Sequence, residues 1–120
     1  VGTGTTRVGS ITANVGDGQV DWVLNANSTY HRLDGTLVGT TGTNRLWSFP
    51  LTTSPLASAT STTVWTGLDA DWTSGNSCSA WTTGVNTGIA ARGDVTATST
   101  AVLHTGTTAC NASRALLCVE

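Results

Sequence analysis

Short stretches in which apolar and polar residues alternate occur along the chain, a pattern typical of strands. In residues 20–24, Val20, Trp22 and Leu24 fall on one face, as in a half-buried strand. Turn-forming glycines precede this stretch, so residues 7–14 and 20–24 are predicted to form a hairpin. No window repeats apolar residues at the i, i+3, i+4 and i+7 positions of an amphipathic helix.

A second hairpin and a central strand are predicted further along the chain. The dipeptide Asp34-Gly35 favours a tight turn, with Tyr30 on one side and the apolar residues 37–39 on the other. Residues 62–68 combine apolar side chains with β-forming threonines and are predicted to be the central strand.

The C-terminal part of the chain is predicted to be a long loop followed by two strands. Residues 69–96 are polar and glycine-rich, and a loop of this length in a compact domain is usually functional or held by cross-links. Residues 96–103 and 114–120 are predicted to be closing strands.

Composition supports a β-rich, loop-rich chain and excludes several classes of function. With 120 residues the chain fits one domain, residues 1–120. Only 10% of residues are charged and lysine is absent, so there is no basic patch for nucleic acid. No apolar run reaches the roughly 20 residues needed to span a bilayer. We expect no enzyme, because the one glutamate is terminal and the two histidines lie in no nucleophile motif.

Three cysteines, Cys78, Cys110 and Cys118, lack the CxxC spacing of zinc sites. The lysine-free, threonine- and glycine-rich composition is typical of an exported bacterial protein, in which disulfides persist. We therefore expect an extracellular or outer-surface location.

Several motifs resemble those of a known family. Residues 64–68, Val-Trp-Thr-Gly-Leu, are similar to the WIGL strand of C-type-lectin-like domains, and residues 116–120 are similar to their closing strand. With residues 34–42 and 65–81, the chain resembles a bacterial domain-of-unknown-function family of secreted and surface proteins, related in fold to C-type lectins and endostatin. The resemblance implies a β-rich α+β fold of twisted antiparallel sheets with long loops.

The resemblance also implies a Cys78–Cys110 disulfide and an upstream partner for Cys118. Members usually begin with a strand and a cysteine-bearing helix that this chain lacks, so we expect the C-terminal two-thirds of such a domain. The pairings Cys110–Cys118 and Cys78–Cys118 stay open on sequence alone. A Cys78–Cys110 bridge is worth roughly 3–4 kcal/mol in the chain-entropy model.

Large side chains are few, so Trp65 and Trp81 are predicted to be core residues, since a tryptophan buries on the order of 200 Å². For Trp72 both a core position and a ligand-contacting position are open. The residues predicted to contact a ligand lie in or beside the 69–96 loop: Asp69, Asp71, Trp72, Asn76 and Arg92.

Two other functions of this loop, calcium binding and integrin binding, have weaker support in the sequence. Asp69, Asp71, Asn76 and Asp94 offer oxygen ligands for calcium, but such residues also close turns, and the calcium–sugar motifs of sugar-binding C-type lectins are absent. We expect no metal or cofactor. The Arg92-Gly93-Asp94 tripeptide, which some integrins bind, is too short to be specific.

Other isolated signals have simpler explanations. Asn27 and Asn111 begin N-glycosylation sequons, which usually have no meaning in a bacterial protein. A Cys–His pair of Cys118 and His104 is conceivable, although a polar surface histidine explains His104 equally well.

The sequence thus predicts a secreted or surface-displayed adhesion module that binds a host or prey glycan or protein through residues 69–96. The alternative is a structural subunit or tip domain of an extracellular fibre, whose edge and apolar groove are filled by its own N-terminal segment as a separate chain or by a neighbouring subunit. A ligand module should expose apolar surface around Trp72, and an assembly module near Val8, Ile11 and Val20.

Overall fold

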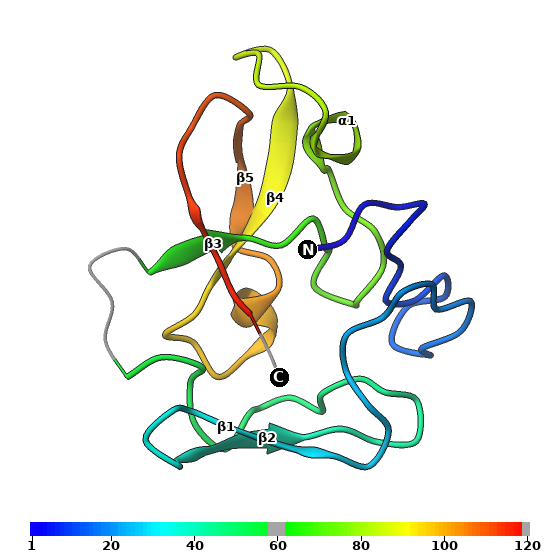
Figure 1. Cartoon of the computed structure of the whole chain (residues 1–120), viewed down its shortest axis with the longest axis vertical. Helices are drawn as coiled ribbons and strands as arrows, with labels where there is room; N and C mark the ends of the chain where they lie inside the picture. Colours follow the sequence, from blue (N-terminus) through cyan, green and yellow to red (C-terminus); the bar gives the residue numbers. More distant parts are fainter. Residues whose placement is uncertain (58–61, 119–120) are drawn as a thin grey trace.

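The computed structural model describes residues 1–57 and 62–118, which form two sheets joined by long loops (Figure 1). The elements, in chain order, are β1 (Thr29–His31), β2 (Leu37–Thr40), β3 (Thr63–Trp65), α1 (Cys78–Trp81), β4 (Ile89–Asp94), the 3₁₀ helix η1 (Thr100–Val102), β5 (Gly106–Ala109) and β6 (Ala115–Leu116). The β-rich class with long loops is confirmed. Within the described residues no helix is long and apolar enough to cross a membrane.

The β1–β2 hairpin forms the lower edge of the molecule in Figure 1. The Asp34 carboxylate accepts a hydrogen bond from the Thr36 backbone N–H at 2.9 Å, and the Arg32 N–H donates to the Thr36 carbonyl at 2.8 Å. This is the bonding expected of an aspartate that closes a turn. The predicted hairpin at Asp34-Gly35 is confirmed, although its loop spans residues 32–36 and is longer than a two-residue turn.

The second sheet has the order β5-β4-β3-β6. Strands β3 and β4 pair antiparallel, as do β4 and β5, whereas β3 and β6 pair parallel. The prediction of a central strand at residues 62–68 is confirmed, because β3 is paired on both sides. The expectation of purely antiparallel sheets is wrong for the β3–β6 pair.

The prediction of one loop over residues 69–96 is wrong. This segment contains α1 and the six-residue strand β4, which is paired on both edges. Ala90, Ala91 and Val95 are completely buried. Two small alanines and a glycine carry little of the bulky apolar signal by which strands are recognised, and this hid a central strand.

Three other predicted strands differ from the structure. The hairpin of residues 7–14 and 20–24 is reduced to a single bridge between Val8 and Val20, since Asp21 has a positive φ of 43° and ends the extended run. Residues 96–103 form a turn and η1 instead of a strand. The closing strand of residues 114–120 is limited to β6 among the described residues, and residues 119–120 lie outside them.

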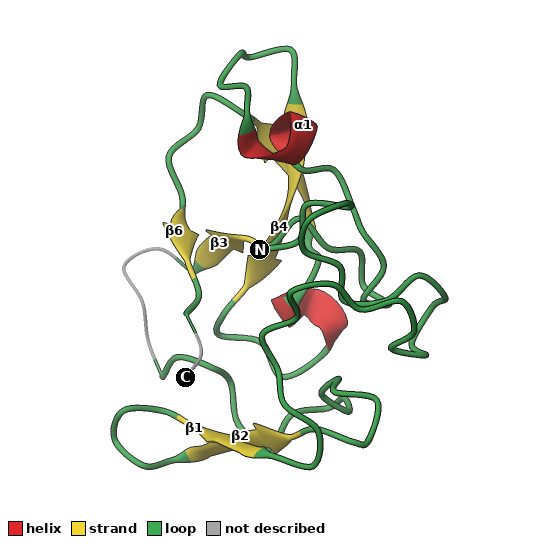
Figure 2. Ribbon diagram, turned by 45° about the vertical axis from the view of Figure 1, so that its right-hand side comes forward, coloured by secondary structure: helices red, strands yellow, loops and turns green. Residues whose placement is uncertain are grey.

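The main core cluster includes Tyr30 of β1, Val38 of β2 and Val102 of η1, and Figure 2 shows η1 between the hairpin and the four-stranded sheet. Trp72 is 3% exposed and lies edge-on to Trp22, with ring centroids 5.9 Å apart. Trp65 and Trp81, predicted to be core residues, are only part-buried and pair with each other at 5.7 Å. Trp72, for which the sequence allowed either a core or a ligand-contacting position, is therefore the core tryptophan of the three.

Candidate functional site

The residues predicted to bind a ligand do not form one exposed cluster. Trp72 is buried in the core and lines a small hollow between the sheets instead of an exposed loop surface. Arg92 lies in β4, and Asn76 is exposed while its carbonyl accepts from the Ala91 N–H at 2.7 Å. Asp69 and Asp71 are part-buried at the turn before Trp72. The two aspartates lie in one turn, but their carboxylates contact different residues, His104 for Asp69 and Thr73 for Asp71.

Both aspartates serve local structure. The Asp71 carboxylate accepts from the Thr73 hydroxyl at 2.5 Å and from the Thr73 N–H at 3.1 Å, and these bonds hold the pKa of Asp71 below its usual value. Asp69 lies 3.2 Å from Nδ1 of His104, and the same nitrogen lies 3.1 Å from the Leu68 carbonyl. Because a carbonyl oxygen can only accept, Nδ1 carries the proton.

Three further sequence signals can be compared with this geometry. Among the described residues no three His, Cys, Asp or Glu side chains gather in a group able to hold a metal ion. His104 bonds to Leu68 and Asp69, and no hydrogen bond joins it to Cys118. The Arg92-Gly93-Asp94 tripeptide lies in β4 with Gly93 buried, and not at a loop tip where a receptor could bind it.

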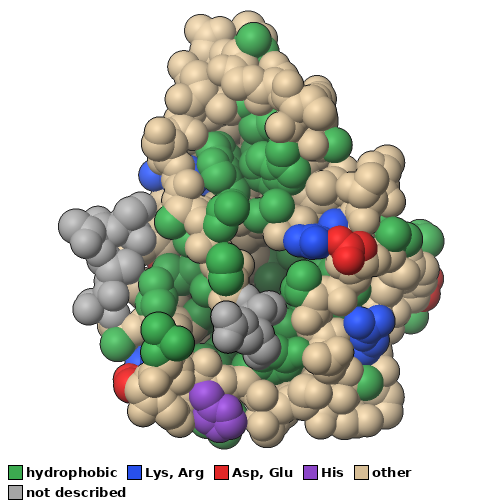
Figure 3. All heavy atoms as spheres, viewed as in Figure 1, with side chains coloured by type: hydrophobic (Ala, Val, Ile, Leu, Met, Phe, Trp, Pro, Cys, Tyr) green, Lys and Arg blue, Asp and Glu red, His purple; other side chains and the backbone are tan. Residues whose placement is uncertain are grey.

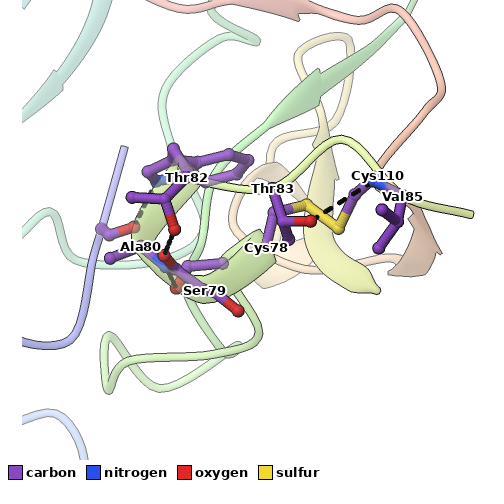
Figure 4. Close-up of a disulfide and its surroundings, with 10 residues drawn as sticks. Cys78, Ser79, Ala80, Thr82, Thr83, Val85 and Cys110 are labelled. Carbon is purple, nitrogen blue, oxygen red and sulfur yellow. Dashed lines mark hydrogen bonds between the residues drawn. A yellow bond between two sulfur atoms is a disulfide. The ribbon is translucent and has the colours of Figure 1, made fainter. Parts of the chain in front are cut away.

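The disulfide joins Cys78 at the start of α1 to Cys110, which follows β5 (Figure 4). Its Cα atoms are 5.7 Å apart, within the normal range. The pairing that the resemblance implied is confirmed, and the two open alternatives are excluded. Cys118 is exposed and unpaired.

The turn α1 is left-handed, since its four residues all have φ between 51° and 65°. Such a conformation costs roughly 1–2 kcal/mol for each non-glycine residue. The disulfide holds one end, and the Trp81 indole N–H donates to the Gly2 carbonyl at 3.0 Å at the other. These contacts keep the exposed loop 82–88 in place beside the sheet.

An apolar groove lies between the two sheets. Its main hollow has a volume of about 720 Å³, within the range of ligand-binding clefts. Tyr30 and Val38 of the hairpin and Trp47 line one side. Leu116 and Leu117 line the other side, with Cys118 beside them.

A smaller hollow of about 80 Å³ extends the groove toward the second sheet. Trp47 and Leu117 line both hollows, and Trp22 and Trp65 line the smaller one. Figure 3 shows apolar side chains gathered in a band on this face, from the four-stranded sheet toward the hairpin. The groove therefore crosses the molecule between its two sheets.

The polar side chains His31, Arg32 and Asp34 also line the main hollow. Nε1 of Trp47 is buried and has no hydrogen-bond partner in the described part of the chain. An unpaired buried donor costs free energy, and a bound acceptor would recover it. At the rim, Arg32 is held by the Ser54 carbonyl at 2.8 Å and the Ser54 hydroxyl at 2.9 Å.

Sequence reasoning expected an apolar groove for an assembly module, with exposed apolar surface near Val8, Ile11 and Val20. It did not find this groove, because its walls come from segments far apart in the chain. Leu33 is fully exposed, and Leu116 is 60% exposed. Exposed leucines beside an apolar hollow are a signal that appears only when the chain is folded.

The family comparison matches most of the chain. No curated protein and no solved structure matches it. A family model described as "Protein of unknown function (DUF1554)" matches residues 1–100. Since that match covers well over half of the sequence, the chain belongs to the DUF1554 family.

Proposed function

We propose that this domain is a protein-binding module that takes an apolar segment of its partner into the groove between the two sheets. The observation that carries the proposal is the 720 Å³ hollow with Leu33 and Leu116 exposed at its rim. Soluble proteins rarely leave such surface uncovered unless it binds something. The proposed binding surface is therefore the groove, and not residues 69–96, which contain a buried strand.

The chemistry of the groove favours a protein over a glycan as its partner. Most of its lining is aliphatic or aromatic, which suits leucine-like or aromatic side chains. The Nε1–H of Trp47, unpaired in the described part of the chain, would donate a hydrogen bond to a backbone carbonyl of an extended or helical segment. A glycan would need several polar partners at the same place.

The cellular setting is part of the same proposal. A disulfide persists in oxidising surroundings, so Cys78–Cys110 supports a secreted or surface-displayed bacterial protein. We propose an adhesion role without catalysis. The two-sheet, loop-rich architecture with its disulfide also supports a C-type-lectin-like or endostatin-like fold.

The test compares two exposed apolar residues, one at the groove and one outside it. Leu33→Asp places a charge at the rim, and Val85→Asp places the same charge in the loop 82–88, where Val85 is 53% exposed. Binding of the purified domain is measured against a panel of extracellular-matrix proteins and a glycan array.

The proposal expects binding to one or more proteins that Leu33→Asp weakens at least tenfold and Val85→Asp leaves unchanged. Binding confined to glycans, or equal losses in the two variants, would overturn it. Absence of binding across the whole panel would also count against an adhesion role.

The second candidate is a subunit of an extracellular assembly. Ile11 is 70% exposed and Val20 is 45% exposed, and Val15 and Val23 nearby are also exposed. Val8, in contrast, is buried. This candidate expects self-association at high concentration in sedimentation experiments, reduced by Ile11→Ser. A strictly monomeric domain would exclude it as a self-assembling subunit.

A further inference from the structure

The chain contains two Asp-Gly dipeptides, and the fold holds them very differently. They are Asp17-Gly18, in the N-terminal loops, and Asp34-Gly35, in the loop of the β1–β2 hairpin. In such a dipeptide the main-chain nitrogen of the glycine can attack the carboxyl group of the aspartate, because glycine has no Cβ to shield that nitrogen. The surrounding structure decides whether the two groups can meet.

The Asp17-Gly18 dipeptide is fixed from several sides. The Asp17 carboxylate accepts hydrogen bonds from the Thr12 N–H at 2.7 Å, the Thr12 hydroxyl at 2.8 Å and the Ile11 N–H at 3.0 Å. The Ile11 side chain also fills the space where a Cβ of Gly18 would lie. The carboxyl group therefore cannot turn toward the Gly18 nitrogen without breaking all three hydrogen bonds.

The Asp34-Gly35 dipeptide, in contrast, is exposed and loosely held. Leu33, Asp34 and Gly35 are all exposed, and no atom lies within 4 Å of the position that a Cβ of Gly35 would occupy. The Gly35 N–H donates to the Arg32 carbonyl at 2.9 Å, and the Asp34 carboxylate accepts from the Thr36 N–H at 2.9 Å. Hydrogen bonds in an exposed hairpin loop open by local fluctuation, which lets the Asp34 carboxyl reach the Gly35 nitrogen.

We propose that Asp34 is a site of spontaneous covalent modification, at which the side chain closes on the Gly35 nitrogen and reopens as isoaspartate. In the first step the nitrogen forms a bond to Cγ of Asp34, and the amide proton leaves with the carboxyl OH as one water molecule. The product is a five-membered succinimide ring. In the second step water adds to the former main-chain carbonyl of Asp34 and breaks its bond to nitrogen. One water is released and one consumed, so the reaction needs no oxidant and no cofactor.

The modification would reshape the rim of the groove. In isoaspartate the main chain runs through Cβ and Cγ, so it is one atom longer at this position, and the Thr36 N–H loses its carboxylate acceptor. Asp34 lines the main hollow, and the adjacent Leu33 is fully exposed at its rim. We therefore expect the modified domain to bind apolar ligands in the groove less tightly. This consequence rests on the proposed function, whereas the modification itself does not.

The experiment measures the uptake of heavy oxygen from water by the whole chain. Each opening of the ring adds one oxygen atom from the solvent, so incubation in heavy-oxygen water labels every aspartate that has passed through the ring. Mildly acidic pH is used, because the protonated carboxyl is the form that loses water. Cleavage after arginine then places Asp34 in peptide 33–45 and Asp17 in peptide 8–32. Fragmentation spectra locate the label and distinguish isoaspartate from aspartate.

In the folded domain the label should accumulate at Asp34 at least tenfold faster than at Asp17, and isoaspartate should appear at Asp34. In denaturant the two sites should react at similar rates, because both are Asp-Gly dipeptides. Equal rates in the folded domain, or no label at Asp34, would overturn the proposal on the wild-type protein alone. A tenfold difference that persisted in denaturant would overturn the structural explanation. Gly35→Ala should slow labelling of Asp34 at least fivefold.

A second measurement tests the consequence for the groove. The isomerised domain is separated from untreated domain, and the affinity of an environment-sensitive apolar dye is measured for each. The isomerised domain should bind the dye at least threefold more weakly, and equal affinities would overturn this consequence. An untreated domain that binds no dye would count against the groove, while the oxygen label would still decide the modification, so the two failures are distinguishable.

Discussion

At the scale of single residues, Gly93 shows how closely the central strand is packed. A Cβ added there would lie 1.8 Å from the Val102 carbonyl oxygen, which belongs to the backbone of η1. Backbone cannot move aside as a flexible side chain can, so the strand and η1 require a glycine at this position. The glycine of the Arg-Gly-Asp tripeptide therefore has a packing role.

We expect Gly93→Ala to lower the free energy of unfolding by about 3 kcal/mol or more, because overpacking forces the backbone apart. Gly84→Ala is the matched control, since nothing lies within 4 Å of its added Cβ and its φ is not in the left-handed range. Urea denaturation of both variants measures the difference. Equal stabilities for the two would contradict this account of Gly93.

Asp17 organises the loop that replaced the predicted N-terminal hairpin. Its carboxylate accepts from the Thr12 N–H at 2.7 Å, the Thr12 hydroxyl at 2.8 Å and the Ile11 N–H at 3.0 Å. These hydrogen bonds, those of Thr12 first, lower the pKa of Asp17 to about 2. The carboxylate takes the backbone donors that a strand ladder would otherwise use, which explains why only the Val8–Val20 bridge remains.

The lowered pKa has a consequence for stability at acid pH. A carboxyl whose folded pKa lies below its usual value of 3.8 stabilises the fold above that pH, and the contribution is lost as the pH falls toward 2. Asp17→Asn should therefore show a shallower fall of unfolding free energy between pH 4 and pH 2 than the wild type. Part of the fall will remain, because the pKa values of Asp34 and Asp71 are also lowered. Parallel profiles for the two proteins would refute a role for Asp17.

At the scale of elements, β4 and α1 depend on contacts that are distant in sequence. The strand is built from small residues and is stabilised by pairing on both edges. The left-handed turn α1 persists because Cys110 and Gly2, at opposite ends of the chain, hold it. Residues in unfavourable backbone regions persist only where surrounding structure determines them.

Removing the disulfide should therefore lower the free energy of unfolding by more than the loss of one contact would. The bridged cysteines are 32 residues apart, and a loop of this length is worth roughly 3–4 kcal/mol. We expect the Cys78→Ser/Cys110→Ser double variant to lose about that much unfolding free energy in denaturant titrations. Cys118→Ser should be neutral, since Cys118 is exposed and unpaired. A double variant as stable as the Cys118 control would show that the bridge does not support the fold.

At the scale of the whole molecule, the two sheets enclose a core on one side and leave the groove open on the other. An environment-sensitive apolar dye should bind the native domain there, because the hollow of about 720 Å³ is accessible and mainly apolar. Leu116→Asp should reduce the dye fluorescence severalfold, while Val85→Asp should not. A native domain that gives no dye signal would argue that the groove is closed in solution.

The sequence by itself determined mainly local features, such as single strands and turns. Apolar side chains combined with β-forming threonines in residues 62–68 were enough to predict β3, and Asp34-Gly35 was enough to predict the β1–β2 hairpin, because turn chemistry and strand propensity act over a few residues. Composition was enough to predict the β-rich class. The disulfide was predicted from family resemblance, since spacing alone left three pairings open.

The tertiary structure alone decided which side chains are buried and which are available. Trp72 lies in the core although the residues around it are polar, whereas Trp65, which follows a valine in an apolar stretch, is only part-buried. The groove arises where hairpin, sheet and C-terminal segment meet. Burial and pairing depend on residues brought together from distant parts of the chain, and a pattern read over neighbouring residues does not contain that information.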